Sequence, residues 1–395
     1  MRALLCERAD EDTIYERRQG KKGVILKNIA VIFGGKSQEH DISVITGVFT
    51  LNALDKTLFK AVPIYIGKDG VWRTGDNLFD VTVFRRGEIK GLKKVTLLCG
   101  ENALYSVEKK LTKLAELAGA IICTHGRNGE DGTVAAVLKL SEIPFASPDV
   151  FASAFSMDKS LTRLCVRALG VKMAEGFTLE RTKYYDDVAA ALERVRRLGY
   201  PVIVKPSSSG SSIGITVVKD ESSLKSAFDL AFGFDVKVVV EEFLDGAFDV
   251  NCACYRSQGK CIVSECERPS GGEFLSFYDK YFGSKGGEKR QFPADIDEKT
   301  SRKIKNITAE IYEKFCFSGI VRIDYLVCGG DVYLNEINSV PGSMAYYLFC
   351  EKISDFTALL TKLLNDAFIR WREYYQSSFA FQSNVLSLEG VNIKK

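Results

Sequence analysis

The chain has 395 residues, 46% of them hydrophobic and 27% charged, and its formal net charge is +3. This length suits two or three domains rather than one small core. A charge so close to balance argues against nucleic acid and against a membrane surface as partners, and the sequence lacks the apolar run of about 18 residues that a membrane span needs.

The first 27 residues are charged and carry no apolar stretch of signal-peptide length. We expect residues 1–27 to form a poorly ordered extension and the protein to be cytoplasmic. The eleven cysteines are an odd number spread along the chain. Because Cys252, Cys254, Cys261 and Cys266 lack the paired spacing of structural zinc sites, reduced thiols buried in strands are the favoured interpretation.

Residues 28–150 alternate strand-like and helix-like patterns, which predicts a doubly wound parallel sheet. The expected elements are, in order, a strand at 28–35, a helix at 42–54, a strand at 61–67, a helix near 107–118, a strand at 118–124 and a helix at 133–142. Ligands bind such sheets beyond the carboxyl ends of the strands. The polar loops 34–41 and 125–132 lie at that end, so we expect a substrate domain.

The loop at 34–41 contains GGKS, which looks like the end of a Walker A loop. That motif needs a glycine where this chain has Ala30, so a Walker nucleotide site is excluded. Glu39 remains as a carboxylate that could hold a substrate ammonium, while Asp41 could simply cap a helix. The second loop, HGRNGEDG, begins at His125 and could shape a pocket; capping by Asp131 is the alternative.

Residues 151–244 form a second pattern, typical of a small α+β unit. We expect helices at 151–170, 186–198 and 222–232 and strands at 201–206, 215–220 and 236–244. The loop KPSSSGSSIGI follows Lys205 and is rich in small residues. Small residues let backbone N–H groups approach phosphate oxygens closely. The loop therefore favours phosphate binding over a merely flexible turn.

Residues 245–368 form the third unit, and residues 369–395 a loosely held tail. This unit is expected to contain strands, a loop from about 268 to 292, a helix at 298–316, a hairpin and a helix at 354–367. The loop is long, aromatic and flanked by glycines, which is typical of a lid. Lys280 and Tyr281 would be its working face; a disordered surface loop is the alternative.

The hairpin RIDYLVCGGDVYLNEINSVPG places ionisable groups inside two apolar strands. Glu336 and Asn338 are two apart, so a strand points both to one face. Asp324 joins them if the loop has an odd number of residues, such as 329–331. Three oxygen donors beside Arg322 suit Mg²⁺ shared with phosphates. The alternative is a salt-bridged hairpin with solvated charges.

Eight motifs along about 28–368 resemble those of the D-alanine–D-alanine ligase family of the ATP-grasp superfamily. They are GGKSQEHDIS, HGRNGEDG, SMDK, KPSSSGSSIG, VVVEEFL, YDKY, RIDYL and NEINSVPG. The resemblance implies an α/β chain with an ATP-grasp fold after a doubly wound N-terminal domain. It also implies a homodimer that uses ATP and Mg²⁺, or Mn²⁺, to join two D-alanines through D-alanyl phosphate for peptidoglycan precursors.

The resemblance also implies roles for individual residues. Glu39 would bind the ammonium of the first D-alanine, with Ser211 and Tyr281 as its partners, and His125 would lie near the acceptor amine. The ATP phosphates would be bound by Lys159, Lys205, Ser211, Ser212 and Lys280, the adenine by Glu241 and Leu244, and the ribose by Asp249. The metal ligands would be Asp324, Glu336 and Asn338, and the oxyanion would be stabilised by Arg322 and the Gly342 N–H.

Three departures from the family pattern bear on substrate choice. Asp249 reaches the ribose-binding position only after a one-residue shift, and Glu242 replaces a lysine-type residue near the adenine. Tyr347 stands where the family has a serine that holds the acceptor carboxylate, so D-serine or another acceptor is an alternative to D-alanine. Tyr281 corresponds to a lid tyrosine that goes with an amine acceptor. A nucleotide-binding protein without catalysis is a further alternative.

Overall fold

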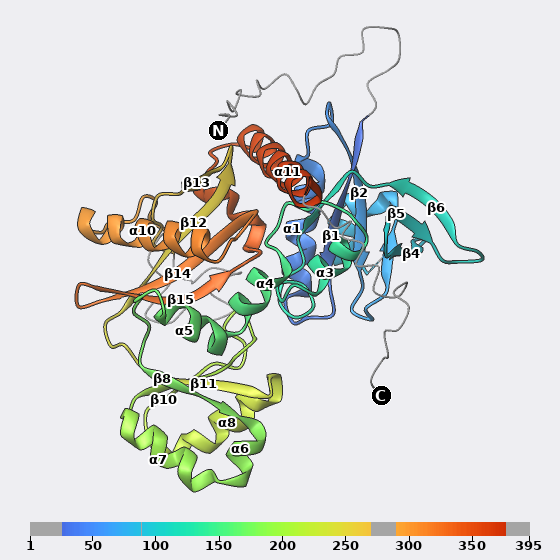
Figure 1. Ribbon diagram of the computed structural model, residues 1–395. Coiled ribbons are helices and arrows are strands. Elements are labelled where there is room, and N and C mark those ends of the chain that lie inside the picture. The colour runs from blue at the N-terminus through green and yellow to red at the C-terminus, as the bar shows by residue number, and fades with distance from the viewer. Residues whose placement is uncertain (1–25, 88, 270–289, 377–395) are drawn as a thin grey trace, which may run out of the picture.

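The computed structural model describes residues 26–87, 89–269 and 290–376, and the chain forms three sheets with their own helices (Figure 1). Most of the expected extension, the lid residues Lys280 and Tyr281, and residues 377–395 of the expected tail lie outside the described residues. Among the described residues no helix is long and apolar enough to cross a membrane.

The first sheet has the strand order β6-β5-β4-β3-β2-β1-β7. Its strands are β1 (Lys27–Gly34), β2 (Phe59–Ile66), β3 (Trp72–Thr74), β4 (Lys93–Leu98), β5 (Glu101–Ser106), β6 (Thr112–Glu116) and β7 (Gly119–Ile122), and its helical segments are α1 (His40–Ala53), η2 (Asp76–Phe79), α2 (Thr82–Arg85) and α3 (Thr133–Leu140). β1 pairs in parallel with β2 and β7, whereas the strands from β3 to β6 pair antiparallel. The parallel strands β1, β2 and β7 correspond to the predicted alternation of strands and helices. The antiparallel strands β3 to β6 extend the same sheet on the β2 side.

The helix predicted near 107–118 is wrong, because this segment belongs to the antiparallel pair β5–β6. Leu111, Leu114 and Leu117 in this segment are spaced by three, as on an apolar helix face. Leu111 and Leu114 are exposed, and Leu117 is buried. A hairpin at the sheet edge needs no continuous apolar stripe, so the spacing was misleading.

The second sheet is antiparallel, in the order β10-β9-β11-β8. Its strands are β8 (Gly176–Glu180), β9 (Val202–Pro206), β10 (Thr216–Val218) and β11 (Lys237–Glu242), and its helical segments are α6 (Arg181–Asp186), α7 (Val188–Leu198), η3 (Glu221–Ser223) and α8 (Leu224–Phe234). Alternate valines of β9 and β11 are buried with α7 and α8 in one core. The opposite face of these strands is left for the site. β8 has no counterpart among the predicted strands.

The third sheet is also antiparallel, in the order β13-β12-β14-β15. Its strands are β12 (Phe248–Ser257), β13 (Lys260–Val263), β14 (Ile320–Cys328) and β15 (Asp331–Asn338), with α10 (Glu298–Lys314) against it. The helices α4 (Val150–Met157) and α5 (Lys159–Arg167) share the core of this sheet. They fall within 151–244, the stretch expected to form the small unit, yet they pack on β15.

Cysteines contribute to the third core. Cys252, Cys254 and Cys266 are buried free thiols there, and Cys261 is a partly buried free thiol. Burial raises the pKa of Cys254 well above that of a solvated thiol. These residues behave as small apolar side chains, which agrees with the interpretation made from their spacing.

The last described segment of the chain packs against the first sheet. The turn η4 (Gly342–Leu348) leads into α11 (Ile353–Gln376), which is longer than the predicted helix at 354–367. α11 lies beside α1 in Figure 1 and contacts α1 and β7. Its buried residues Phe356, Leu360 and Leu364 belong to the same core as β1 and β7.

Candidate active site

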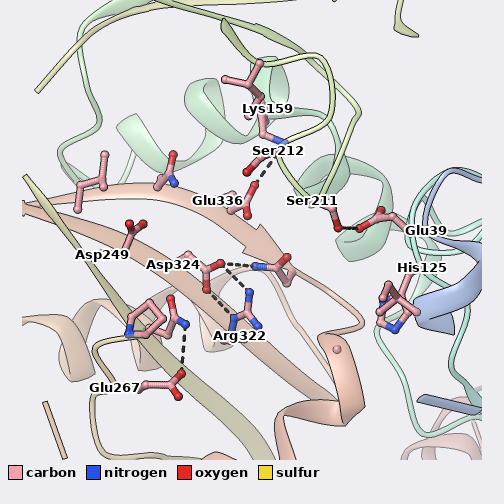
Figure 2. Close-up of a pocket in the computed structure, with 18 of the residues that line it drawn as sticks. Glu39, His125, Lys159, Ser211, Ser212, Asp249, Glu267, Arg322, Asp324 and Glu336 are labelled. Carbon is pink, nitrogen blue, oxygen red and sulfur yellow. Dashed lines mark hydrogen bonds and ion pairs between the residues drawn. The ribbon is translucent and has the colours of Figure 1, made fainter. Parts of the chain in front are cut away.

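A cavity of about 550 Å³ is lined by residues of the second and third sheets and by residues of α1 and of two loops that follow strands of the first sheet (Figure 2). The predicted site residues at its wall are Glu39, His125, Lys159, Lys205, Ser211, Ser212, Leu244, Asp249, Arg322, Asp324, Glu336, Asn338 and Gly342. The fold therefore gathers side chains that are far apart in the sequence. Glu241 is not among the residues at the wall, and Lys280 and Tyr281 lie outside the described residues.

The turn of the β14–β15 hairpin differs from the prediction. Cys328 pairs with Asp331, so the loop is the two residues Gly329 and Gly330. Both glycines have positive φ angles, of 57° and 83°, as a tight hairpin turn of this kind requires. The expected odd-numbered loop is wrong, and the row of oxygen donors must be aligned in another way.

A β-bulge aligns the donors. Asp324 pairs with Glu336 and Arg322 pairs with Asn338, but the register shifts immediately after Asp324 and leaves Asn335 as the extra residue. Without this residue, Glu336 and Asn338 would point to the opposite face of the sheet, because a shift of one reverses the side-chain alternation. The bulge thus places all four polar side chains on the cavity side.

Arg322 and Asp324 form a bidentate pair in the middle of this row. The Arg322 Nε and Nη2 groups donate to the two oxygens of Asp324 at 2.7 and 2.8 Å, and Asn338 Nδ2 donates at 3.0 Å. Burial is the largest single influence on the pKa of Arg322 and lowers it, but the charges and hydrogen bonds of Asp324 and Tyr347 together outweigh burial, and the net pKa is raised. The guanidinium is therefore a permanent cation in the cavity.

A smaller cluster surrounds the Glu39 carboxylate at the other end of the cavity. Ser211 Oγ donates to Glu39, which is the contact expected from the motifs (Figure 2). Gly126 and Gly210 approach the same carboxylate so closely that a Cβ on either would lie 2.7 Å from Oε2. Glycine is required at Gly126 for a second reason, its φ of +68°.

Lys159 is held between α5 and the serine-rich loop. Its Nζ donates to the Ser209 carbonyl at 2.7 Å and lies 3.5 Å from Glu336 Oε2. Asp158 caps α5 and also accepts from the Ser207 hydroxyl at 2.6 Å. The α5 N-terminus and the loop are thereby fastened together, with a lysine ammonium directed into the cavity.

The sequence matches two family models, "D-ala D-ala ligase N-terminus" over residues 28–148 and "D-ala D-ala ligase C-terminus" over residues 165–365. The chain belongs to the D-alanine–D-alanine ligase family. A D-alanine–D-alanine ligase of Sulfurimonas denitrificans is 36% identical over 85% of this chain and 92% of its own length. One from Thermosipho africanus is 32% identical over 92% and 99%.

Solved structures of ligases in this family have the same fold. The D-alanine–D-alanine ligase of Helicobacter pylori is 30% identical, with a TM-score of 0.71 over 86% of this chain and 98% of that one. The VanG D-Ala:D-Ser ligase of Enterococcus faecalis is 28% identical, with a TM-score of 0.73 over 87% and 100%. This ligase fold is the mixed α/β architecture predicted from the sequence, and the family uses ATP.

His125 is buried at the wall of the cavity. Its Nε2 is 3.0 Å from Thr46 Oγ1, which also accepts from the Ser343 N–H at 3.0 Å. Burial is the main cause that lowers the pKa of His125, to about 4. The imidazole is therefore neutral at neutral pH and orders the start of η4 through Thr46.

Glu130 joins two motifs of the ligase family. Its carboxylate accepts from the Gly126 N–H at 2.8 Å and from the Val340 N–H at 3.2 Å. Burial, followed by the charge of Glu39, raises the pKa of Glu130 to about 8. Backbone donors favour the ionised form, but burial outweighs them. Glu130 is thus a neutral link between the Glu39 end and the segment that leads to Gly342.

Tyr347 lines the cavity beside Arg322. Its hydroxyl accepts from Arg322 Nη1 at 3.1 Å, and its carbonyl accepts from Arg290 Nη2 at 3.1 Å. The Arg290 guanidinium lies 5.1 Å from the Tyr347 ring centre, and it also pairs with Glu267. Aromatic and cationic groups therefore fill this part of the cavity.

The sequence did not identify four residues of the site and its surroundings: Thr46, Glu130, Arg163 and Arg290. A signal existed for Thr46, because Ser43, Thr46 and Thr50 recur on the buried face of an otherwise apolar helix and each is fully buried. Glu130 lay inside a recognised motif without an assigned role. Arg163 and Arg290 had no signal, since surface arginines are common in any chain.

Proposed function

We propose that the protein joins two D-alanine molecules at the expense of ATP, through D-alanyl phosphate, to make D-alanyl-D-alanine for peptidoglycan precursors. One observation carries this proposal: a single cavity holds Glu39 with Ser211 at one end and the aligned row of Arg322, Asp324 and Glu336 at the other. An amino acid bound by its ammonium at Glu39 would direct its carboxylate toward that row.

The donors on β14 and β15 suit a divalent ion. Among the described residues no three His, Cys, Asp or Glu side chains gather into a metal cluster; the row instead offers two carboxylates, Asp324 and Glu336, and the amide of Asn338. That set matches Mg²⁺, which takes few protein ligands and completes its shell with phosphates and water. When bound, Mg²⁺ or Mn²⁺ would offset the negative charge of the phosphate oxygens.

The lysines would position the nucleotide. Lys159 and Lys205 reach the cavity from α5 and β9, and the small residues of the serine-rich loop let backbone N–H groups approach phosphate oxygens. Ser212 lies in this loop, while Leu244, between β11 and β12, and Asp249, on β12, also line the cavity. Leu244 would contact the adenine and Asp249 the ribose.

Phosphoryl transfer would form a bond from the first carboxylate to the γ-phosphorus, with ADP leaving. The second amine would then attack the acyl carbon, and collapse of the tetrahedral intermediate would release phosphate. Arg322 and the Gly342 N–H are placed to stabilise the oxyanion, because preorganised donors lower the energy of the developing charge. Neutral His125 would orient the acceptor end rather than carry a charge.

The decisive experiment is mass identification of the product formed from ATP, D-alanine and a panel of competing amino acids, with phosphate release as the rate measurement. We expect D-alanine-dependent phosphate release and a D-alanyl-D-alanine product. Phosphate release that does not depend on D-alanine would refute the proposal.

A second candidate acceptor is D-serine. It is favoured by Tyr347, whose hydroxyl lies in the acceptor end beside Arg322, and one structural relative is a D-Ala:D-Ser ligase. The same product analysis separates the two, because D-alanyl-D-serine is heavier by one oxygen atom. The proposal further includes a cytoplasmic homodimer, which cell fractionation and sedimentation would test.

A further inference from the structure

Three buried charged side chains meet beneath the serine-rich loop. Arg163 Nη1 lies 2.6 Å from Glu241 Oε1, and Lys205 Nζ lies 2.5 Å from Glu241 Oε2. The three side chains are 6%, 7% and 5% exposed. Each oxygen of Glu241 therefore faces one cation.

Local geometry explains why these residues meet. Lys205 on β9 pairs with Val239 on β11, and Glu241 is two residues further along β11. Side chains two apart on a strand share a face, so Lys205 and Glu241 are diagonal neighbours. Arg163 is four residues after Lys159 on α5, which places both on one face of that helix.

Arg163 is anchored at a second point. Its Nη2 donates to the Ala174 carbonyl at 2.5 Å, in the segment that connects α5 to β8. The guanidinium is thus held at two points. Its planar fork suits two simultaneous bonds, whereas a lysine at this place could make fewer in a fixed geometry.

The charges in this cluster do not cancel. Two cations surround one carboxylate, so the cluster keeps one positive charge, and Lys205 is the member at the cavity wall. Without Arg163, Glu241 would pair with Lys205 alone and neutralise it. In a poorly solvated site such a change strongly affects an anionic ligand.

We propose that Arg163 is a positioning residue for nucleotide binding: it shares the Glu241 carboxylate with Lys205 and so leaves the Lys205 charge to a substrate phosphate. The proposal rests on the proposed function, because the phosphate is that of ATP.

The test measures binding rather than turnover. Isothermal titration calorimetry with ADP and with adenosine, both in MgCl₂, separates phosphate contacts from base contacts. For Arg163→Gln we expect ADP affinity to fall about tenfold, as for the loss of one charge-assisted contact, while adenosine affinity stays unchanged. Because the effect is electrostatic, the loss should shrink as salt is raised.

Two further variants make the test independent of simple damage to the fold. Arg163→Lys keeps the charge and should recover most of the ADP affinity. Arg163→Gln combined with Glu241→Gln removes one cation and the carboxylate, so the positive charge of Lys205 is no longer offset and ADP should bind more tightly than to Arg163→Gln alone. A merely structural arginine would make the double variant worse.

Arg167→Gln is the matched control. Arg167 lies on the same helix and pairs with Glu175 at 2.9 Å, but its side chain is 44% exposed, so its loss should leave ADP binding unchanged. Equal losses of ADP and adenosine affinity in Arg163→Gln, or a double variant weaker than the single, would overturn the proposal. A wild-type protein that binds neither nucleotide would instead overturn the proposed function.

Discussion

The two ends of the cavity are built on opposite principles. At the first end, Gly126 and Gly210 crowd the Glu39 carboxylate, and there is no room for one additional carbon. At the proposed acceptor end, Tyr347 and Arg290 fill space with long side chains that contact each other. We infer that the first end admits one substrate geometry, whereas the acceptor end sets, and can change, specificity.

The largest expected effect comes from adding a carbon to the first end. In Gly210→Ala the Cβ would collide with Glu39 Oε2, so the carboxylate must move. We expect kcat/KM for D-alanine to fall about a hundredfold, as misplacement by about 1 Å commonly does. Gly233→Ala is the control, because a Cβ there meets nothing within 4 Å and activity should be retained. Equal activity of both variants would contradict a rigid first end.

Glu130 tests the link between the ends. Its pKa is raised to about 8 in the fold, against about 4.5 when solvated, so the native state holds one more proton between these values. Stability from this group is full below about pH 4.5 and is lost as pH rises toward 8. Relative to Glu130→Gln, wild type should lose about 2 kcal/mol between pH 5.5 and 7, which is about 1.36 kcal/mol per pH unit.

Urea unfolding of both proteins across that pH range measures this difference. Both proteins contain the same other titrating groups, so the difference between their free energies of unfolding removes the contributions of those groups. Because glutamine cannot ionise, the difference that remains is due to Glu130. A constant difference in the free energy of unfolding would show that Glu130 is already ionised at pH 5.5.

Tyr347 tests the adaptable end. Tyr347→Ser should admit larger D-amino acids and change the KM of the acceptor about tenfold, since the Arg322 contact and a ring are both lost. Tyr347→Phe retains the size and removes only the hydroxyl, so it should alter KM without widening the range of acceptors. Product analysis with an acceptor panel decides; an unchanged range in Tyr347→Ser would place specificity elsewhere.

Arg290 gives the smallest expected effect. Its side chain is 41% exposed, so its contacts with Glu267 and the Tyr347 carbonyl are partly screened by water. For Arg290→Gln we expect a change of about threefold in the acceptor KM and none in the KM of ATP. Steady-state kinetics with each substrate varied in turn would reveal this split; a larger effect on ATP would argue that Arg290 serves the nucleotide.

Much of the site was predictable because its residues lie in short motifs. Glu39, Ser211 and Arg322 were found from their motifs, and the structure brings them to one cavity. The bulge at Asn335 was not predictable, because no residue type marks it and only the cross-strand pairing reveals it. Short motifs identify the residues of the site, whereas the register between two strands depends on contacts between segments that are apart in the sequence.

The fold was predictable where local pattern and packing agree, as in β1 and α1. It was not where they conflict. The helix expected at 107–118 is a hairpin edge, and α4 and α5 leave the small sheet for the core of the third. The position of a helix in the fold depends on which other apolar surface its apolar face packs against, and this pairing cannot be read from a single sequence. The division at residues 150 and 244 stays a prediction.

The return of α11 to the first sheet has a consequence for synthesis. The ribosome makes β1, α1 and β7 early, but Leu359, Leu360, Leu363 and Leu364, which complete their core, come from the last described helix. Until those leucines emerge, an apolar side of the newborn first sheet lacks its cover. We expect the first sheet to mature only after translation nears its end, and the nascent chain to need shielding from aggregation meanwhile.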